Sequence, residues 1–300
     1  MTLSPRLAAV GRRVLRWQDE RAVPAELREN WRDLPDIGGI TDGWRDRLHR
    51  DRVEMVPWLH GTQSLSGRRV LEVGAGEGVA CVAVAEQGAS VIGIDIDEPA
   101  LARAQQLCAG LDVELHHMNS TDIARFAEAG IDWVIFWASL EHMTLEERLI
   151  SLRAAWSLLP CGGLLTIIET PNRLWPFDAH TSQVPFFNWL PDDLAFLYSS
   201  RSPRAGFGGT TYADASAQML DFLRRGRGFS HHEVEVAVGT EATRSVVSSM
   251  QLERRRRQRL RGTGWRLSSH GATERALSRF DPGLHPAWLQ PFLYLTLRKP

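Results

Sequence analysis

The sequence predicts an α/β protein with a seven-stranded, mostly parallel sheet and helices on both of its faces. From residue 69 to residue 169, short apolar runs alternate with segments of helical period. The first run passes directly into a glycine-rich turn, and the second ends on Asp95-Ile96-Asp97. Such alternation requires right-handed crossovers that place helices on both faces of the sheet. Ligands of these sheets bind outside the carboxyl ends of the strands.

The apolar runs mark five strands and the segments between them mark helices. We expect these strands at 69–73, 90–95, 112–117, 131–137 and 163–169. We expect the helices at 78–87, 98–109, 121–128 and 145–159. Two late strands, His232–Val238 and Phe292–Leu297, are expected to add an antiparallel hairpin at the sheet edge, with a charged helix over 241–261 between them.

The predicted sheet and its flanks divide the chain into four parts. Residues 1–65 are expected to form an N-terminal helical extension, broken at Pro24, Pro35 and Pro57 and with apolar residues at helical spacing at Leu7, Val10, Val14 and Trp17. Residues 66–170 form the core of the sheet. Residues 171–230 are rich in Pro, Gly, Phe and Trp without a clean period, which indicates a lid or insertion on the substrate side. Residues 231–300 complete the sheet.

Composition limits the partners that this chain can have. The net charge of −1 gives no overall attraction to nucleic acid or membrane, and no apolar stretch is long enough to span a bilayer. Scattered cysteines at positions 81, 108 and 161 indicate a reducing compartment, so we expect a cytoplasmic protein. Lys299 is the only lysine, which excludes a Walker-type phosphate loop. The composition is compatible with a homo-oligomer.

The glycine-rich turn indicates a ligand that contains adenosine. Glycine lacks a Cβ and tolerates positive φ, so the turn allows close approach of a ligand, and an acid about 20 residues later suits a ribose diol. Val79 fills the place of the third glycine in the dinucleotide fingerprint. The pattern Glu72-x-Gly74-x-Gly76 instead resembles the first motif of class I S-adenosylmethionine (SAM) methyltransferases, and the resemblance covers residues 66–172.

This resemblance implies a Rossmann-like fold with SAM as the cofactor. The residues that it places at the cofactor are Glu72, Gly74, Ala75, Gly76, Asp95, Ile96, Asn119, Ser120 and Trp137. Asp95 would accept from both ribose hydroxyls, and Asn119, or alternatively Asp122, would contact the adenine edge. Asp97 is the less favoured ribose ligand, since it fits a helix cap, and the Ser120-Thr121-Asp122 segment fits a plain helix cap equally well.

The segment Leu140-Glu141-His142 follows the run 131–137. It resembles the ubiquinone-biosynthesis O-methyltransferases and related natural-product and sugar O-methyltransferases. A hydroxyl nucleophile must lose its proton during methyl transfer, and a histidine can accept it. His142 is therefore expected to act as a base or as a metal ligand, with Glu141 orienting it or sharing a divalent ion such as magnesium. The alternative is that His142 caps a helix or packs against the lid.

A polar segment continues from the run 163–169 and resembles a subset of bacterial sugar and secondary-metabolite methyltransferases. Asn172, Arg173 and Asp178 are expected to bind the acceptor, and His180 to act in catalysis or help to hold a metal. The alternative is a loop that satisfies its own backbone through Asx turns. Nearby aromatic residues would stack on the acceptor or pack the insertion on the core: Trp175, Phe177, Phe186, Phe187 and Trp189.

A second charged feature is the arginine-rich run at 254–261. It is either a solvated helix face or a site for a phosphorylated acceptor, an RNA or an acidic partner. No aromatic residues interleave with these arginines, so nucleic acid is not an expected partner.

Together these motifs predict a SAM-dependent methyltransferase that acts on a hydroxyl of a small-molecule or glycan acceptor. The alternatives are N- or C-methylation of a small molecule, a nucleotide-binding oxidoreductase, and an inactive partner subunit of the same fold. Val79 in the loop and the single lysine, Lys299, disfavour the oxidoreductase.

Overall fold

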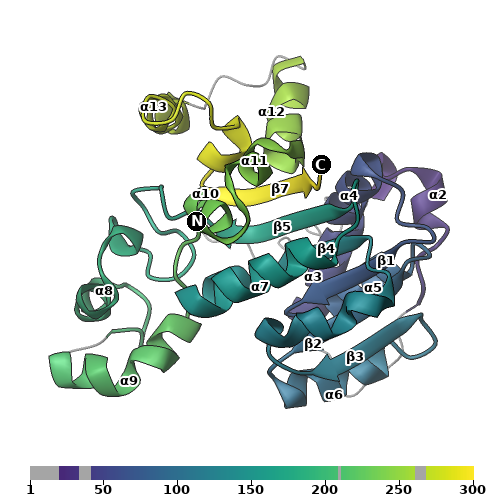
Figure 1. The fold of residues 1–300 in the computed structure, drawn as a ribbon, viewed down its shortest axis with the longest axis horizontal. Helices are drawn as coiled ribbons and strands as arrows, with labels where there is room; N and C mark the ends of the chain where they lie inside the picture. The colour runs from purple at the N-terminus through teal and green to yellow at the C-terminus, as the bar shows by residue number, and fades with distance from the viewer. Residues whose placement is uncertain (1–19, 34–41, 209–210, 261–267) are drawn as a thin grey trace, which may run out of the picture. The chain divides into compact units, whose positions relative to one another are not determined.

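The computed structural model describes residues 20–33, 42–208, 211–260 and 268–300. Its seven strands form one mixed sheet in the order β3-β2-β1-β4-β5-β7-β6 (Figure 1). This order is typical of Rossmann-like methyltransferases and confirms the predicted fold class. No helix in the described segments combines the length and the apolarity that a membrane span requires.

The five early strands lie where the apolar runs predict them, within two residues at either end. They are β1 (Arg69–Val73), β2 (Ser90–Asp95), β3 (Val113–His117), β4 (Trp133–Trp137) and β5 (Leu164–Pro171). β2 pairs with β3 in parallel, as β4 does with β5. β7 (Phe292–Arg298) runs antiparallel to β5, and β6 (Val246–Ser249) runs antiparallel to β7. The predicted antiparallel edge is therefore present.

The first part of the molecule comprises residues 1–70 and 75–117. Its described helical segments are α2 (Ala25–Arg28), α3 (Asp42–Arg50), the π-helix Asp51–Met55, α4 (Val56–Thr62), α5 (Val79–Ala85) and α6 (Glu98–Leu107). Gln87 fixes the N-terminal helices to the end of α5, because it bonds Asn30 at 3.0 Å and the Leu27 carbonyl at 3.2 Å. The expected break at Pro57 is wrong, since helical backbone continues from the π-helix through Met55 and Val56 into α4 across this proline. Pro35 and the apolar residues 7, 10, 14 and 17 lie outside the described residues.

The second part comprises residues 71–74 and 118–300. After β3 come the 3₁₀ segments Ser120–Ala129 and Leu140–His142, and then α7 (Leu145–Leu158). Residues 171–230 contain α8 (Asp192–Tyr198) and α9 (Tyr212–Arg224), which lie side by side (Figure 1). Phe187, Phe196 and Phe222 pack between them in a buried aromatic cluster. The insertion therefore has a small apolar core of its own.

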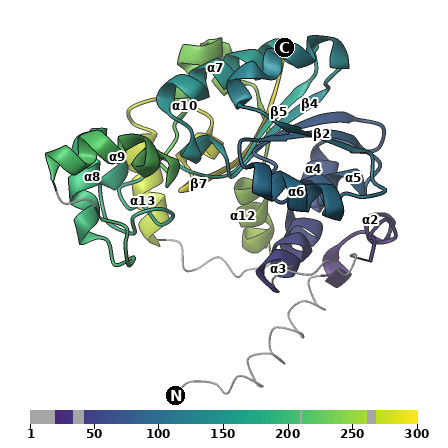
Figure 2. The same cartoon turned by 90° about the horizontal axis from the view of Figure 1, so that it is seen from below.

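The C-terminal segment contains the largest errors of prediction. Residues 231–238 form helix α10 (His231–Val238), which lies beside α7 (Figure 2), and not a strand. Its buried residues, His231, Glu233, Val234 and Ala237, follow helical spacing, whereas Val236 is 66% exposed. A Ser230–Glu233 capping box starts the helix.

The predicted helix over 241–261 is also wrong in part. The chain forms α11 (Thr240–Arg244), then strand β6, and then α12 (Met250–Leu260). The short α13 (Ser268–Leu277) and the 3₁₀ turn Pro286–Leu289 lead into β7. The edge strand is thus Val246–Ser249, which pairs with β7, and not residues 231–238.

Candidate functional site

A strained turn at the end of β4 positions the predicted catalytic residues. Ala138 has a φ of +47°, and its amide donates to the Ile168 carbonyl of β5 at 2.9 Å. Positive φ at a non-glycine residue is costly and is often found at functional sites. The turn leads directly into Leu140–His142. It also packs on Gly74, where an added Cβ would lie 2.5 Å from the Ser139 Cβ, so position 74 requires glycine.

Glu141 is a carboxyl group without access to solvent. Its exposed fraction is 0%, and burial raises its pKa to about 8. Thr170 donates to Oε2 at 3.3 Å, whereas Oε1 has no hydrogen-bond partner among the described residues. A buried polar oxygen without a partner is costly, which indicates that Oε1 faces a place where a ligand can bind.

His142 is held in one tautomer by the backbone of the insertion. Its Nδ1 lies 2.7 Å from the Arg224 carbonyl oxygen. Because a carbonyl can only accept, Nδ1 carries the proton and Nε2 keeps its lone pair. Nε2 lies 3.9 Å from Oε1 of Glu141. Burial lowers the pKa of His142, so the ring is neutral at physiological pH.

His180 comes from the loop after β5 and completes the group. Its Nε2 lies 4.0 Å from Oε1 of Glu141, and its ring centroid is 6.0 Å from that of His142. Burial lowers the pKa of His180 as well. One donor atom from each of the three residues lies within 4.8 Å of the others. We call Glu141, His142 and His180 the histidine–glutamate cluster. It can accept a proton from a hydroxyl or hold a divalent cation.

The residues predicted to bind the acceptor are engaged with the protein itself. Asp178 is 3% exposed and accepts from the amides of His180, Thr181 and Ser182. Asn172 is 2% exposed, and its amide group donates to the carbonyls of Trp288 and Gln290. The guanidinium of Arg173 donates to the Asn188 carbonyl at 3.0 Å. In this structure these side chains shape the loop that carries His180, as the Asx-turn alternative describes, and their contact with an acceptor stays a prediction.

The aromatic residues of the same segment divide into two groups. Trp175 and Phe187 are buried and pack the insertion. Phe177, Phe186 and Trp189 are about half exposed, and the rings of Phe186 and Trp189 lie 5.0 Å apart. The exposed group is the part that remains available to a ligand.

In the first part of the molecule, Asp95 organises the glycine-rich turn. Its Oδ2 accepts from the Gly76 amide at 2.7 Å, and its Oδ1 accepts from the Asp97 amide at 2.9 Å. A Cβ added to Gly76 would meet no atom within 4 Å, so space remains beside the backbone for a ligand. Asp97 caps α6 by accepting from the Ala100 amide at 2.9 Å, which is the alternative that the sequence offered for it. Ala75 is buried, whereas Ile96 is 51% exposed.

The remaining predicted cofactor residues belong to the second part. Glu72 is buried in β1, and Trp137 is buried at the end of β4. Asn119 caps the 3₁₀ segment by accepting from the Thr121 amide at 3.0 Å, and its amide group donates to Glu147 at 3.2 Å. Ser120 accepts from Ser151 at 2.8 Å. Neither position excludes an adenine contact, which stays a prediction.

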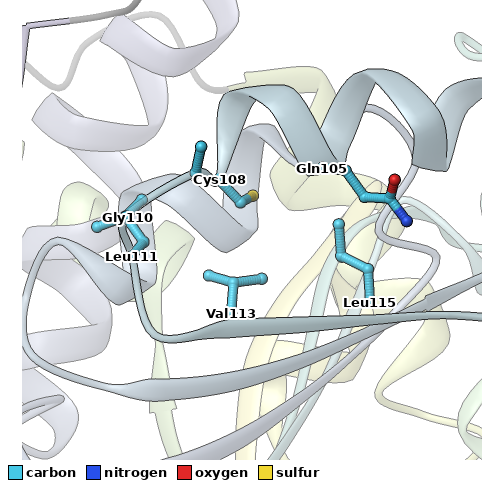
Figure 3. A pocket seen from close by; sticks show the side chains of 7 residues that line it. Gln105, Cys108, Gly110, Leu111, Val113 and Leu115 are labelled. Carbon is cyan, nitrogen blue, oxygen red and sulfur yellow. The ribbon is translucent and has the colours of Figure 1, made fainter.

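A separate hollow of about 200 Å³ lies between the end of α6 and β3 (Figure 3). Side chains of Gln105, Cys108, Val113 and Leu115 line it, with Leu111 at one end. None of the predicted site residues lines this hollow. It is therefore distinct from the histidine–glutamate cluster.

Sequence reasoning missed three residues that support the cluster. Thr170 bonds the Glu141 carboxyl, Arg148 donates to the Glu141 carbonyl at 3.2 Å, and Arg224 supplies the carbonyl that fixes His142. Arg148 is 3% exposed, although an arginine in a helix would be expected from the sequence to lie on the surface. The contacts of Thr170 and Arg224 join segments that are 29 and 82 residues apart, and that of Arg148 crosses the turn before α7, so no local motif marks them.

Comparison with known proteins identifies the core of the chain. Residues 70–163 match the family model of a methyltransferase domain. A ubiquinone biosynthesis O-methyltransferase of Pseudomonas entomophila is 36% identical over 149 residues, which are 47% of this chain and 63% of the relative. The Pseudomonas putida enzyme of the same name is 35% identical over the same coverage. The match thus spans less than two thirds of these relatives.

Solved structures of methyltransferases also match the chain. A SAM-dependent methyltransferase of Methanosarcina mazei is 23% identical, with a TM-score of 0.36 and coverage of 40% of this chain and 59% of that one. An S-adenosylmethionine-dependent methyltransferase of Mesorhizobium loti is 22% identical, with a TM-score of 0.35 and coverage of 42% and 56%. The family match and the strand order carry the assignment. Residues 70–163 are a class I SAM-dependent methyltransferase domain, distantly similar to the ubiquinone biosynthesis O-methyltransferases.

Proposed function

We propose that this protein transfers the methyl group of SAM to a hydroxyl oxygen of a small-molecule or glycan acceptor. The observation that carries the proposal is the fixed tautomer of His142, whose Nδ1–H is bound to the Arg224 carbonyl and whose Nε2 keeps its lone pair. An oxygen nucleophile needs such a proton acceptor, because a neutral hydroxyl attacks poorly. The similarity to relatives named O-methyltransferases supports the same choice of nucleophile.

The residues of the glycine-rich turn fit the cofactor that the domain implies. Gly74, Gly76 and Gly78 all have positive φ, and the space beside Gly76 is free. Asp95 ends β2 with a carboxylate that can also accept from a ribose hydroxyl. We therefore assign Glu72, Gly74, Gly76 and Asp95 to SAM. When bound, SAM supplies an activated methyl group on a sulfonium, so the protein has only to align the acceptor and remove a proton.

In the proposed reaction the acceptor hydroxyl lies against the histidine–glutamate cluster. Its proton passes to Nε2 of His142 as the new C–O bond forms, and the Arg224 carbonyl stabilises the resulting imidazolium through Nδ1–H. Glu141 is protonated because it is buried. It therefore places a neutral polar group beside the hydroxyl, with no negative charge that would compete with His142 for the proton. His180 is placed to bind the same hydroxyl or a neighbouring one.

A divalent cation is the second role that the cluster supports. Oε1 of Glu141 is buried, has no hydrogen-bond partner in the described part of the chain, and lies about 4 Å from an imidazole nitrogen of each histidine. This donor set suits magnesium, manganese or zinc. Such an ion would supply positive charge next to the acceptor oxygen. Under this alternative His142 and Glu141 are ligands and the base lies elsewhere.

We further propose that residues 171–230 form the acceptor side of the site. This insertion provides His180 and the carbonyl of Arg224, and it exposes Phe177, Phe186 and Trp189. Flat apolar surface with a few placed polar groups is what a small-molecule pocket requires. The cytoplasmic location of the enzyme stays a prediction.

Replacement of His142 tests the proposal. We expect His142→Ala to lower turnover by about 10²–10⁴-fold, as loss of a general base does, while SAM affinity stays at the wild-type value. Formation of S-adenosylhomocysteine is measured with a panel of phenols, catechols and sugars, and SAM binding by titration calorimetry. His232→Ala is the matched control, because this histidine is exposed on α10 and no contact joins it to the cluster.

The outcomes separate the two roles of the cluster. Turnover within a few-fold of wild type in His142→Ala removes His142 from the mechanism. If a chelator abolishes wild-type activity and magnesium restores it, the cluster holds a metal. If a chelator has no effect and His142→Ala is inactive, His142 is the base.

A further inference from the structure

A second group of metal-ligating side chains lies outside the histidine–glutamate cluster. His231 and Glu235 belong to α10, and Asp281 lies in the loop between α13 and the Pro286–Leu289 turn. One donor atom from each residue lies within 4.8 Å of the other two. All three lie outside residues 70–163, so the methyltransferase domain does not account for them.

The local fold brings these residues together for identifiable reasons. His231 and Glu235 are four residues apart on α10, so their side chains share one face of the helix. The capping box at Ser230 fixes where the helix starts and therefore where His231 points. Glu235 is oriented by Thr243 of α11, whose hydroxyl donates to Oε1 at 3.0 Å.

His231 carries an independent sign that a ligand is needed. The residue is 4% exposed, and its ring lies 3.8 Å from the ring of His232 and 6.3 Å from that of Trp288. Its Nδ1 is buried and has no hydrogen-bond partner among the described residues. A buried polar nitrogen without a partner is costly, so such atoms usually have an unseen partner.

We propose that His231, Glu235 and Asp281 bind a divalent transition-metal ion. The donor set is one imidazole nitrogen and two carboxylates, which suits zinc or manganese better than magnesium or calcium, because the latter two prefer oxygen ligands alone. Water would complete the coordination sphere. The ion would link α10 to the loop at Asp281 and so hold the C-terminal segment in place. The proposal is independent of methyl transfer.

α10 also connects this site to the rest of the second part. Glu233 lies on α10 between the two ligands and pairs with Arg148 at 3.0 Å, and Arg148 in turn donates to the carbonyl of Glu141. An ion that fixes α10 would therefore stabilise the packing of α7 as well. A stabilising role predicts an effect on unfolding and not on the proton transfer itself.

Zinc binding to the 300-residue chain tests the proposal. Zn²⁺ is titrated by calorimetry, and bound zinc is counted after equilibrium dialysis, for the wild type and for Asp281→Asn and Glu235→Gln. We expect both variants to bind one zinc fewer per chain, or to bind it at least about tenfold more weakly, since each loses a charged ligand. Glu241→Gln is the matched control, because Glu241 is an exposed residue of neighbouring α11 that pairs only with Arg244 among the contacts of the described residues.

Two further measurements keep the result unambiguous. Glu141→Gln removes a possible ligand of the histidine–glutamate cluster and none of the α10 site. Zinc that this variant still binds should therefore be the zinc at α10. In the Glu141→Gln background, zinc should raise the Tm of the protein and of its Glu241→Gln variant but not of its Asp281→Asn variant, and far-UV circular dichroism checks that each variant is folded. The proposal fails if folded Asp281→Asn and Glu235→Gln bind zinc with the stoichiometry and affinity of the wild type.

Discussion

The chemistry of Glu141, His142 and His180 depends on burial more than on charge. Burial raises the pKa of the carboxyl to about 8 and lowers the pKa of both imidazoles. At neutral pH all three groups are therefore uncharged in the free protein. A proton from the acceptor hydroxyl, or a cation, can therefore bind to an imidazole lone pair that is not already engaged in an ion pair. This is the state that a base for a weakly acidic hydroxyl requires.

The pH dependence of turnover follows from the direction of these shifts. A histidine base works only when neutral, and the pKa of His142 lies below its ordinary value of 6.5. We expect the acid-side decline of kcat/KM to have its midpoint below pH 6.5, where His142 becomes protonated. A rate profile measured with a saturating chelator checks this. A decline that is already half complete above pH 7 would contradict a His142 base in this environment.

Asp95 holds the glycine-rich turn and is proposed to bind the ribose. Substitutions at this position test the second role. Its carboxylate bonds the amides of Gly76 and Asp97, and we assign the ribose to the same group. Asp95→Ala should weaken SAM binding by on the order of 1–3 kcal/mol, because buried donors lose their acceptor. Asp95→Asn keeps one acceptor oxygen and should lose less. Calorimetry with SAM checks both, and unchanged affinity in Asp95→Ala would place the ribose elsewhere.

At the level of elements, helix α7 joins the cluster to the C-terminal segment through Arg148. This buried side chain pairs with Glu233 of α10, and it donates to the backbone carbonyls of Glu141 at 3.2 Å and Arg227 at 2.8 Å. A buried cation of this kind is expensive to remove from water, so its partners must remain in place. The turn that carries Glu141 and His142 is thus held from one side by α7.

Removal of Arg148 should therefore destabilise the fold strongly. Arg148→Leu leaves Glu233 buried without its partner, and we expect a loss of about 3–5 kcal/mol in the free energy of unfolding. Arg153→Leu is the control on the same helix, because the one side-chain bond of Arg153 within the described residues is a long one, of 3.4 Å, to the Ala237 carbonyl. Urea unfolding measures both. A similar small loss in the two variants would show that the Arg148 network contributes little.

The early strands could be predicted because each is a short apolar run bounded by a turn. Val70–Val73 before the glycines and Trp133–Trp137 before Ala138 are clear cases, and both are buried on nearly every residue. The sequence of α10 predicts a strand, because Val234, Val236 and Val238 alternate with polar or small residues, and this prediction is wrong. Only the capping box at Ser230, followed by burial of Val234 and Ala237, distinguishes the helix.

The site could be predicted only as far as local motifs reach. Glu141, His142 and His180 stand out by residue type, and the structure brings them together. The contacts that tune them involve Thr170, Arg148 and Arg224, which no spacing rule connects to the motif. Tertiary contacts between distant segments decide the tautomer of His142 and the pKa of Glu141, and a single sequence does not encode these in a local pattern.

The molecule as a whole combines a methyltransferase domain with segments that the domain does not explain. Residues 70–163 account for the sheet from β1 to the start of β5, whereas the insertion and the C-terminal helices lie beyond the family match. The insertion has its own aromatic core around Phe187 and Phe222, and it supplies His180 to the cluster. Specificity for the acceptor is therefore expected to reside outside the family domain.

The most direct test of the central claim is to follow the methyl carbon itself. The protein is incubated with SAM labelled with ¹³C in its methyl group and with phenol, catechol, sugar and amine acceptors, and the products are examined by carbon NMR and mass spectrometry. The account predicts a labelled methyl ether, formed by the wild type and lost in His142→Ala. Label found on nitrogen or carbon of the product, or a methyl ether formed equally by His142→Ala, would contradict it.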